Sequence, residues 1–245
     1  MSDATTVADR VTRIQPSPST AAAARAKQLR VAGRDILDLT VGEPDVDTPD
    51  AVKQAAIAAI LAGETKYTPV NGIPALRRAI ADRYRRRDEI AYDDNEITVG
   101  GGAKQVIYLA LTATVNAGSE VIVPAPYWVS YPDMVRANDG TPVIVECSED
   151  DDFKLTPEAL EAAITERTRW VILNAPGNPT GAAYTADELR GWPRCSCDTR
   201  RCSFWSTRSM TRSGTTPNRW PTCWWSSRPC GRACSRSTGC PRATR

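Results

Sequence analysis

The sequence has no run of about 18 apolar residues, and its first twenty residues lack an apolar stretch of any length. These absences speak against a membrane-spanning helix and against an ordinary signal peptide. Residues 1–190 contain one cysteine, Cys147, which by itself indicates neither a disulfide nor a metal site. We therefore expect a soluble cytoplasmic protein with no membrane partner and no bound metal.

The last 55 residues lack leucine, isoleucine and valine altogether. Residues 191–245 hold instead 11 arginines, seven of the eight cysteines, five of the seven tryptophans and a single acid, Asp198. Residues 1–190 carry 20 Lys and Arg against 28 Asp and Glu. Because a segment without branched aliphatic side chains cannot assemble an ordinary hydrophobic core, we expect residues 191–245 to be irregular.

The first part of the chain has helical signals. Ser19 begins an Ala-rich stretch that stops at Gly33. Thr48 is the expected cap of a second helix, with Pro49 at its first position. Residues 73–87 have the apolar spacing of a third, amphipathic helix.

From residue 96 onward, extended and helical patterns alternate. We expect strands at 96–99, 120–125, 141–147 and 169–174, with helices between them and the last of these helices capped by Thr156. This alternation predicts an α/β fold with a mostly parallel sheet flanked by helices. Ligands are then expected at the carboxyl ends of the strands.

A run of three glycines lies between an expected strand and the following helix, in "TVGGGAKQV" around Gly100, Gly101 and Gly102. The N–H groups at a helix start, together with glycines that let the backbone approach closely, form an anion site, most often for phosphate. A tight turn that simply requires glycine explains the run equally well.

Two further loops follow expected strands. "APYWVSYP" contains Tyr127, Trp128 and Tyr131, whose rings either stack on a flat ligand or pack beneath the loop. "NAPGNPTG" contains Asn174 and Asn178 in a loop stiffened by proline, which either aims an amide at a ligand or is turn chemistry alone. Three such loops together favour one shared site.

Five ordered motifs make a specific resemblance: "LTVGEPD", "KYTPVNGIPALRRAI", "ITVGGGAKQ", "PAPYWVSYPDMV" and "NAPGNPTG". In this order and spacing they resemble the aspartate aminotransferase branch of the class I pyridoxal-phosphate aminotransferases, enzymes of amino acid metabolism and biosynthesis. The resemblance covers about residues 10–190, roughly the first half of a family member. It implies the large domain of a fold-type I transferase, truncated in this chain.

For the cofactor, the resemblance implies that Gly102, Ala103 and Lys104 hold the phosphate of pyridoxal 5'-phosphate through backbone N–H groups. Trp128 would stack on the pyridine ring, and Asn178 would hydrogen-bond the phenolic oxygen.

For the substrate, the resemblance implies that Gly42 contacts the carboxylate and that Trp128 and Asn178 border the substrate. Tyr67 would reach the phosphate of the neighbouring subunit in a homodimer. The implied reaction moves an amino group from an amino acid, aspartate or a close relative, to a 2-oxo acid.

Transamination requires a lysine that forms a Schiff base with the cofactor. The chain's lysines are Lys27, Lys53, Lys66, Lys104 and Lys154. All of them precede the "NPTG" loop, whereas the family's catalytic lysine, its pyridine aspartate and its substrate arginine follow that loop. We therefore expect no catalytic lysine in this chain, and we expect the chain to be poorly folded and catalytically incompetent.

The composition of residues 191–245 allows several interpretations. An odd number of cysteines in a cytoplasmic context argues against a disulfide scaffold, and one C-x-C without histidine argues against zinc. A basic arm that contains tryptophan is a possible interaction or nucleic-acid module on a non-catalytic α/β fragment. None of these explains why the helix that begins at "TADELR" should be interrupted.

A frameshift explains the interruption. Reading each codon after Arg190 one base earlier turns Cys and Trp codons into Leu, Val or Met codons and restores aliphatic residues. Permitted third bases give "LAEVLLRH" for 192–199, which continues the helix begun at Thr185. They give "LVDALYDEIRYD" for 205–216, a strand with an aspartate across Ser206 and Thr207. They also give "VNGVSK" for 237–242, with the missing lysine across Pro241 and Arg242.

The domain organisation follows from these patterns. We expect residues 1–48 to form an N-terminal arm and small-domain segment, residues 49–190 part of a cofactor-binding large domain, and residues 191–245 an out-of-frame tail without a core. We expect no nucleic-acid partner.

Overall fold

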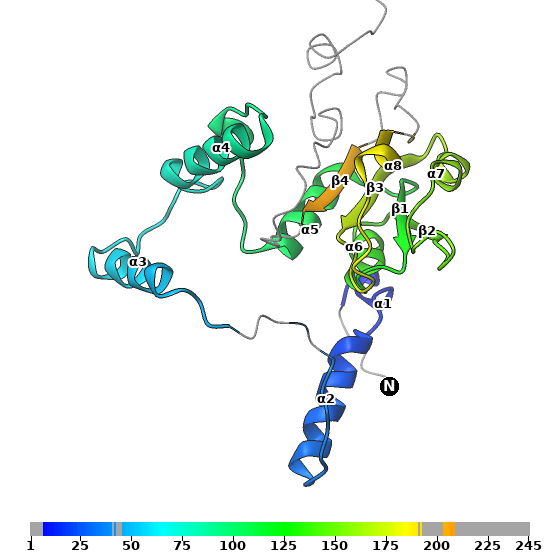
Figure 1. Cartoon of the computed structure of the whole chain (residues 1–245), viewed down its shortest axis with the longest axis horizontal. Coiled ribbons are helices and arrows are strands. Elements are labelled where there is room, and N and C mark those ends of the chain that lie inside the picture. Colours follow the sequence, from blue (N-terminus) through cyan, green and yellow to red (C-terminus); the bar gives the residue numbers. More distant parts are fainter. Residues whose placement is uncertain (1–6, 41, 43–45, 191, 193–202, 209–245) are drawn as a thin grey trace, which may run out of the picture. The chain divides into compact units, whose positions relative to one another are not determined.

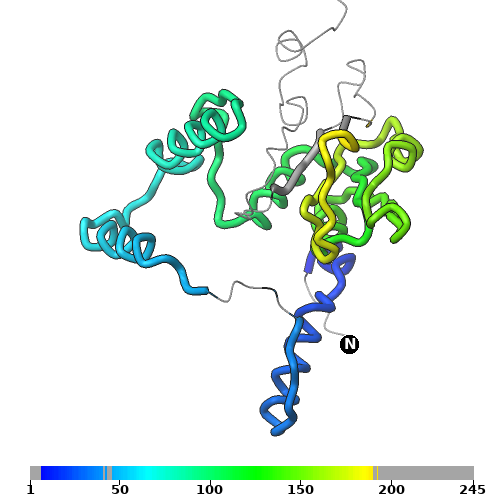
Figure 2. Tube along the Cα trace, in the orientation of Figure 1, coloured from blue at the N-terminus to red at the C-terminus, as the bar shows by residue number. Residues whose placement is uncertain are grey.

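The computed structural model describes residues 7–40, 42, 46–190, 192 and 203–208. The chain divides into two units, one formed by Pro16–Val106 and the other by Met1–Gln15 together with Ile107–Arg245. Figure 2 follows the backbone through both units. Within the described ranges, no helix combines the length and the apolar character needed to cross a membrane.

The unit Pro16–Val106 is helical in its described part (Figure 1). Its elements are α2 (Pro18–Val31), α3 (Asp50–Leu61), α4 (Pro74–Asp88), the 3-10 turn η1 (Asp94–Glu96) and the first turn of α5 (Ala103–Thr114). These helices bury little within the described chain: α2 buries Ala26, α4 buries Ala81, and α3 buries no residue.

The unit that contains Ile107 and the residues after it is built on a parallel sheet (Figure 1). Its strands are β1 (Glu120–Ala125), β2 (Thr141–Glu146), β3 (Thr168–Ala175) and β4 (Ser203–Arg208), in the order β2-β1-β3-β4. All three pairings are parallel. The helices of this unit are α1 (Asp9–Thr12), α5 from Ile107 onward, α6 (Ser130–Ala137), α7 (Pro157–Ala163) and α8 (Ala186–Arg190).

The two faces of the sheet carry separate hydrophobic clusters, because successive side chains of a strand point to opposite faces. On one face, Val121 and Ile172 pack with α5 and α6, and on the other, Ile122 and Val171 pack with α7 and α8. Strands β1 and β3 are buried almost throughout, as expected for parallel strands covered on both sides. The predicted α/β fold, with a parallel sheet between helices, is confirmed.

Several predicted helix boundaries are confirmed or shifted by one residue. Thr156 caps α7 as expected, because its side chain accepts a hydrogen bond of 3.2 Å from the N–H of Ala159. Helix α2 begins at Pro18 rather than at Ser19, and Ser17 caps it. The helix predicted after Thr48 is confirmed as α3, but its predicted cap was wrong by one residue: Pro49 is the N-cap and the helix begins at Asp50.

The strand predicted at 96–99 is absent from the described structure. Glu96 closes the turn η1, and Ile97 is extended and buried. The N–H of Val99 donates to the carbonyl of Asn71 at 3.1 Å, which is a single bond and not a ladder. An apolar extended segment becomes a strand only beside a neighbouring strand, and residues 96–99 have none within the described chain.

The expectation that residues 191–245 are irregular and without a core was wrong at two places. Residues 203–208 form β4, which pairs in parallel with β3, because a ladder requires only backbone groups. Trp192 is only 4% exposed, and its ring meets that of Tyr184 edge to face at 5.4 Å. The rest of this tail lies outside the described residues.

Candidate functional site

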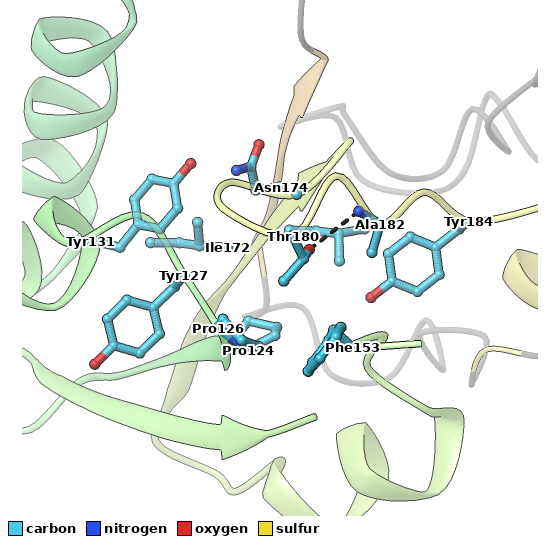
Figure 3. Close-up of a pocket in the computed structure, with 12 residues that line it drawn as sticks. Pro124, Pro126, Tyr127, Tyr131, Phe153, Ile172, Asn174, Thr180, Ala182 and Tyr184 are labelled. Atoms are coloured by element: carbon cyan, nitrogen blue, oxygen red, sulfur yellow. Dashed lines mark hydrogen bonds between the residues drawn. The ribbon is translucent and has the colours of Figure 1, made fainter. Parts of the chain in front are cut away.

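The carboxyl ends of β1 and β3 border a small pocket, in the place expected for a ligand in a parallel sheet (Figure 3). Pro124 and Tyr127 line it from β1 and the loop after β1, and Asn174 and Thr180 line it from β3 and its following loop. The arrangement arises because both strands run in the same direction and therefore deliver their loops to one edge.

The aromatic loop after β1 divides into a packed part and a partly exposed part. Tyr131 was expected in the loop but is the second residue of α6 and only 3% exposed, because its ring belongs to the core cluster. Trp128 packs against the same cluster and meets the Tyr131 ring edge to face at 5.3 Å. The Trp128 ring therefore has a rigid support and retains partial exposure, which suits a stacking role.

The loop after β3 is closed by its own hydrogen bonds. The N–H of Gly177 donates to the carbonyl of Ala182, and the N–H of Gly181 donates to the carbonyl of Gly177, both at 2.8 Å. The N–H of Ala182 donates to Oγ1 of Thr180 at 3.2 Å (Figure 3). Asn178 is exposed on this closed loop, whereas Asn174 lines the pocket.

Phe153 and Tyr184 also line the pocket, and the sequence patterns did not single them out. The hydroxyl of Tyr184 accepts a hydrogen bond of 2.8 Å from the N–H of Leu155, and burial raises the pKa of Tyr184 to about 12. The hydroxyl therefore stays protonated at neutral pH. Isolated aromatic residues outside a motif give no sequence signal, so only the folded chain identifies them.

The glycine run lies in the unit Pro16–Val106, at the start of α5. Gly102 has φ +108°, and a Cβ built there would meet nothing within 4 Å, so the space beside the helix start is open. The helix begins at Ala103, and Lys104 adds an exposed cation in its first turn. Open space, helix N–H groups and a positive charge fit a phosphate group.

Gly42 and Tyr67 belong to the same unit and are both exposed, Tyr67 fully. Gly102, Ala103 and Lys104 lie in this unit too, whereas Trp128 and Asn178 belong to the unit with the sheet. The structure thus brings the loops after β1 and β3 together at one pocket. The helix start at Gly102 belongs to the other unit. The roles of Gly42 and Tyr67 stay predictions.

Lys154, which follows the lining residue Phe153, is unsuited to nucleophilic chemistry. Its Nζ forms ion pairs with Glu188 at 2.9 Å and with Asp152 at 3.4 Å. The hydrogen bond to Glu188 raises the pKa of Lys154 above its ordinary value, so the amine stays charged at neutral pH.

The chain is an α/β protein with loops at the carboxyl edge of a parallel sheet, and a glycine-rich helix start such as that of α5 is typical of phosphate-binding α/β proteins. The family described as aminotransferase class I and II matches residues 34–191. The chain belongs to this family.

Relatives and solved structures agree with this assignment. Aspartate/prephenate aminotransferase of Cereibacter sphaeroides is 56% identical over 183 residues, covering 75% of this chain and 46% of that protein. A probable aspartate/prephenate aminotransferase of Rickettsia conorii is 51% identical over 183 residues, with the same shares of 75% and 46%. The chain thus spans about half the length of the curated relatives it matches.

Two solved structures share the fold. The aspartate aminotransferase from Rhizobium meliloti has a TM-score of 0.78 and 44% identity, over 82% of this chain and 50% of that one. The enzyme from Thermus thermophilus with maleate has a TM-score of 0.77 and 42% identity, over 82% and 52%. The predicted fold-type I architecture is confirmed for the part of the chain that they cover.

Proposed function

We propose that the intact protein is a pyridoxal-phosphate-dependent aminotransferase. The main support is the glycine-rich start of α5, where the N–H groups of the helix start face the open space beside Gly102. This segment lies within the residues that the family matches. The names of the relatives point to aspartate as amino donor and to prephenate, itself a 2-oxo acid, as acceptor.

Different residues of the described chain would bind different parts of the cofactor. The N–H groups of Gly102, Ala103 and Lys104 would hold the cofactor phosphate. Trp128 would stack on the pyridine ring, and Asn178 would donate to the phenolic oxygen, as the family resemblance implies. The bound cofactor supplies the electron sink that lets an amino acid lose its Cα proton.

The remaining assignments concern the substrate and the assembly. Gly42, Trp128 and Asn178 border the amino acid. Tyr67, fully exposed in the single chain, serves the cofactor phosphate of a second copy in a cytoplasmic homodimer. A side chain that functions in the partner's site has no reason to be covered within its own chain.

We further propose that the chain as given does not transaminate, because it carries an out-of-frame segment after about Arg190. The family match ends at residue 191, which supports this position for the shift. Of the five lysines, Lys154 is held charged by Glu188, and none follows the Asn178 loop. The sequence then has no lysine after the Asn178 loop, where the family's Schiff-base lysine lies, to link the cofactor and move the substrate proton.

The position of β4 supports the same proposal. Ser206 pairs with Leu173 and Thr207 with Asn174, the residue of β3 that lines the pocket. An aspartate encoded across positions 206 and 207 would therefore emerge beside Asn174, where an acid can hold the pyridine nitrogen protonated. Trp192 likewise fills an apolar position that the restored frame gives to Leu, Val or Met.

The experiment compares the 245-residue chain with the whole product of the same gene when its frame is corrected after Arg190 and read through to the stop codon of that frame. With aspartate and a 2-oxo acid, the corrected chain should transaminate and the given chain should not. The corrected chain with Asn178→Ala serves as the site control and should lose about tenfold to hundredfold in kcat/KM. Activity of the given chain at a comparable rate would contradict the proposed incompetence, and an inactive, folded corrected chain would contradict the proposed reaction.

A further inference from the structure

Two segments of the unit Pro16–Val106 contact each other immediately before the glycine run. Residues 71–77 include the start of α4, and residues 94–99 lead directly into Gly100. The N–H of Val99 donates to the carbonyl of Asn71 at 3.1 Å. This hydrogen bond fixes the backbone one residue before the glycines.

Gly72 leaves no room for a side chain at this contact. It has φ +99°, and a Cβ built there would lie 2.9 Å from both Cβ and Cγ2 of Val99. Such distances fall inside van der Waals contact, and the β-branched Val99 cannot swing both atoms away. A larger residue at position 72 must therefore displace the backbone at Val99.

Arg77 holds the other end of the segment. Its Nη1 donates to the carbonyl of Asp94 at 2.8 Å, while its Nε is buried without a hydrogen-bond partner in the described chain. A buried donor without a partner carries a desolvation cost, so Arg77 occupies this position at some cost in stability. The turn η1 that it holds is closed by the capping box between Asp93 and Glu96.

Gly100 and Gly101 lie against side chains of the first turn of α5 and couple residues 94–99 to that turn. A Cβ at Gly100 would lie 2.6 Å from Cγ2 of Val106, and the N–H of Gly101 donates to Oε1 of Gln105. The first turn of α5 therefore rests on these glycines. A shift at Val99 must tilt or loosen the N–H groups of that turn.

We propose that Gly72 and Arg77 are positioning residues for the glycine-rich loop, acting through residues 94–99 and touching neither substrate nor cofactor. The proposal rests on the proposed function only where it assigns a cofactor phosphate to this loop. The contacts of Gly72 with Val99 and of Arg77 with Asp94, which we call the clamp, are present in the chain without ligand.

The test uses the full 245-residue chain with two matched pairs of variants. Gly72→Ala is compared with Gly63→Ala, because Gly63 also has a positive φ, +80°, yet has no atom within 4 Å of its would-be Cβ. Arg77→Met is compared with Arg78→Met, its exposed neighbour on α4. The second pair keeps the proposal testable if Gly72→Ala fails to fold.

The first measurement is amide hydrogen exchange of residues 94–106 without ligand. Gly72→Ala and Arg77→Met should exchange about tenfold faster there than wild type, and both controls should exchange at the wild-type rate. Wild-type exchange of this segment in a folded Arg77→Met chain, or equal acceleration in variant and control, would overturn the proposal.

The second measurement is the ratio of Kd values for pyridoxine and pyridoxine 5'-phosphate, which isolates the contribution of the phosphate. Wild type and controls should prefer the phosphorylated ligand, and Gly72→Ala and Arg77→Met should lose about tenfold of that preference. If the wild-type chain binds both ligands equally, the proposed cofactor role of the loop is contradicted. The hydrogen-exchange data then still test whether Gly72 and Arg77 hold residues 94–99 in place. A preference unchanged in both test variants contradicts the positioning role.

Discussion

At the scale of single residues, burial identifies the side chains on which stability depends. Leu160 is fully buried in α7, within the cluster on the α7 and α8 face of the sheet. We expect Leu160→Ala to lower the free energy of unfolding by about 3 kcal/mol, from lost transfer energy and the cavity left behind. Urea unfolding measures this.

Leu109→Ala is the matched control, since Leu109 is 53% exposed on α5. It should change the free energy of unfolding by less than about 0.5 kcal/mol. Equal losses in the two variants would show that the cluster around Leu160 is not packed as described.

Motifs with special backbone or ring chemistry carry a signal in the sequence itself, whereas packing carries none. The glycines before α5, Trp128 and the Asn178 loop carry signals in their own residue types. Tyr131 was misplaced into a loop, because nothing local distinguishes a ring that stacks on a ligand from one that fills a core.

At the scale of elements, α8 is anchored by a pair of groups far apart in the sequence. Glu188 accepts hydrogen bonds from the N–H of Thr185 and from Nζ of Lys154, while the Thr185 hydroxyl accepts from the N–H of Glu188. The hydrogen bond between Lys154 and Glu188 lowers the pKa of Glu188 and raises that of Lys154. The helix start is thus joined to the segment that contains Phe153.

These shifts fix the pH dependence of stability. The lowered pKa of Glu188 gives a contribution that is present above its unfolded value of about 4.3 and is lost as pH falls through the folded value. The raised pKa of Lys154 gives a contribution that is present below about 10.4 and is lost as pH rises through the folded value. The pair is therefore complete at neutral pH.

We expect Lys154→Met to lower the free energy of unfolding at pH 7 by about 0.5 kcal/mol, a modest value because the Glu188 side chain is 40% exposed. As pH falls through the lowered folded pKa of Glu188, the difference from wild type should shrink, since Glu188 then becomes protonated. Lys53→Met is the control, because its partner Asp50 is 84% exposed and the pair joins adjacent turns of α3 only. A loss in Lys154→Met that is as large at low pH as at neutral pH would contradict the role of this pair.

An element could be predicted when the groups that stabilise it lie close in the sequence, and not when they lie in a distant segment. Thr156 was recognised as a cap because capping is local, whereas the strand expected at 96–99 depended on a neighbouring strand that no local pattern reveals. A strand near β4 was predicted only for the restored reading frame. In the chain as given it was not expected, because its pairing with β3 depends on the backbone and leaves no mark in the hydrophobic pattern.

At the scale of the whole molecule, the proposed change of frame makes a prediction about DNA. The codon of Ser206 should be TCG, because an aspartate across Ser206 and Thr207 requires G at its third position. The codon of Pro241 should be CCA and that of Arg242 should begin with AG, which together spell lysine. Sequencing the gene checks both, and any other third base in Ser206 would remove the proposed aspartate.

The ladder between β3 and β4 has a further consequence. It is made of peptide groups, which every reading frame supplies, so the sheet edge can accept a segment that is out of frame, as we propose for β4. The pocket beside Asn174 has no such tolerance, because its chemistry depends on the identity of each side chain. A shift of frame can therefore leave the backbone pairing of β3 and β4 intact while it removes the side chains that catalysis requires.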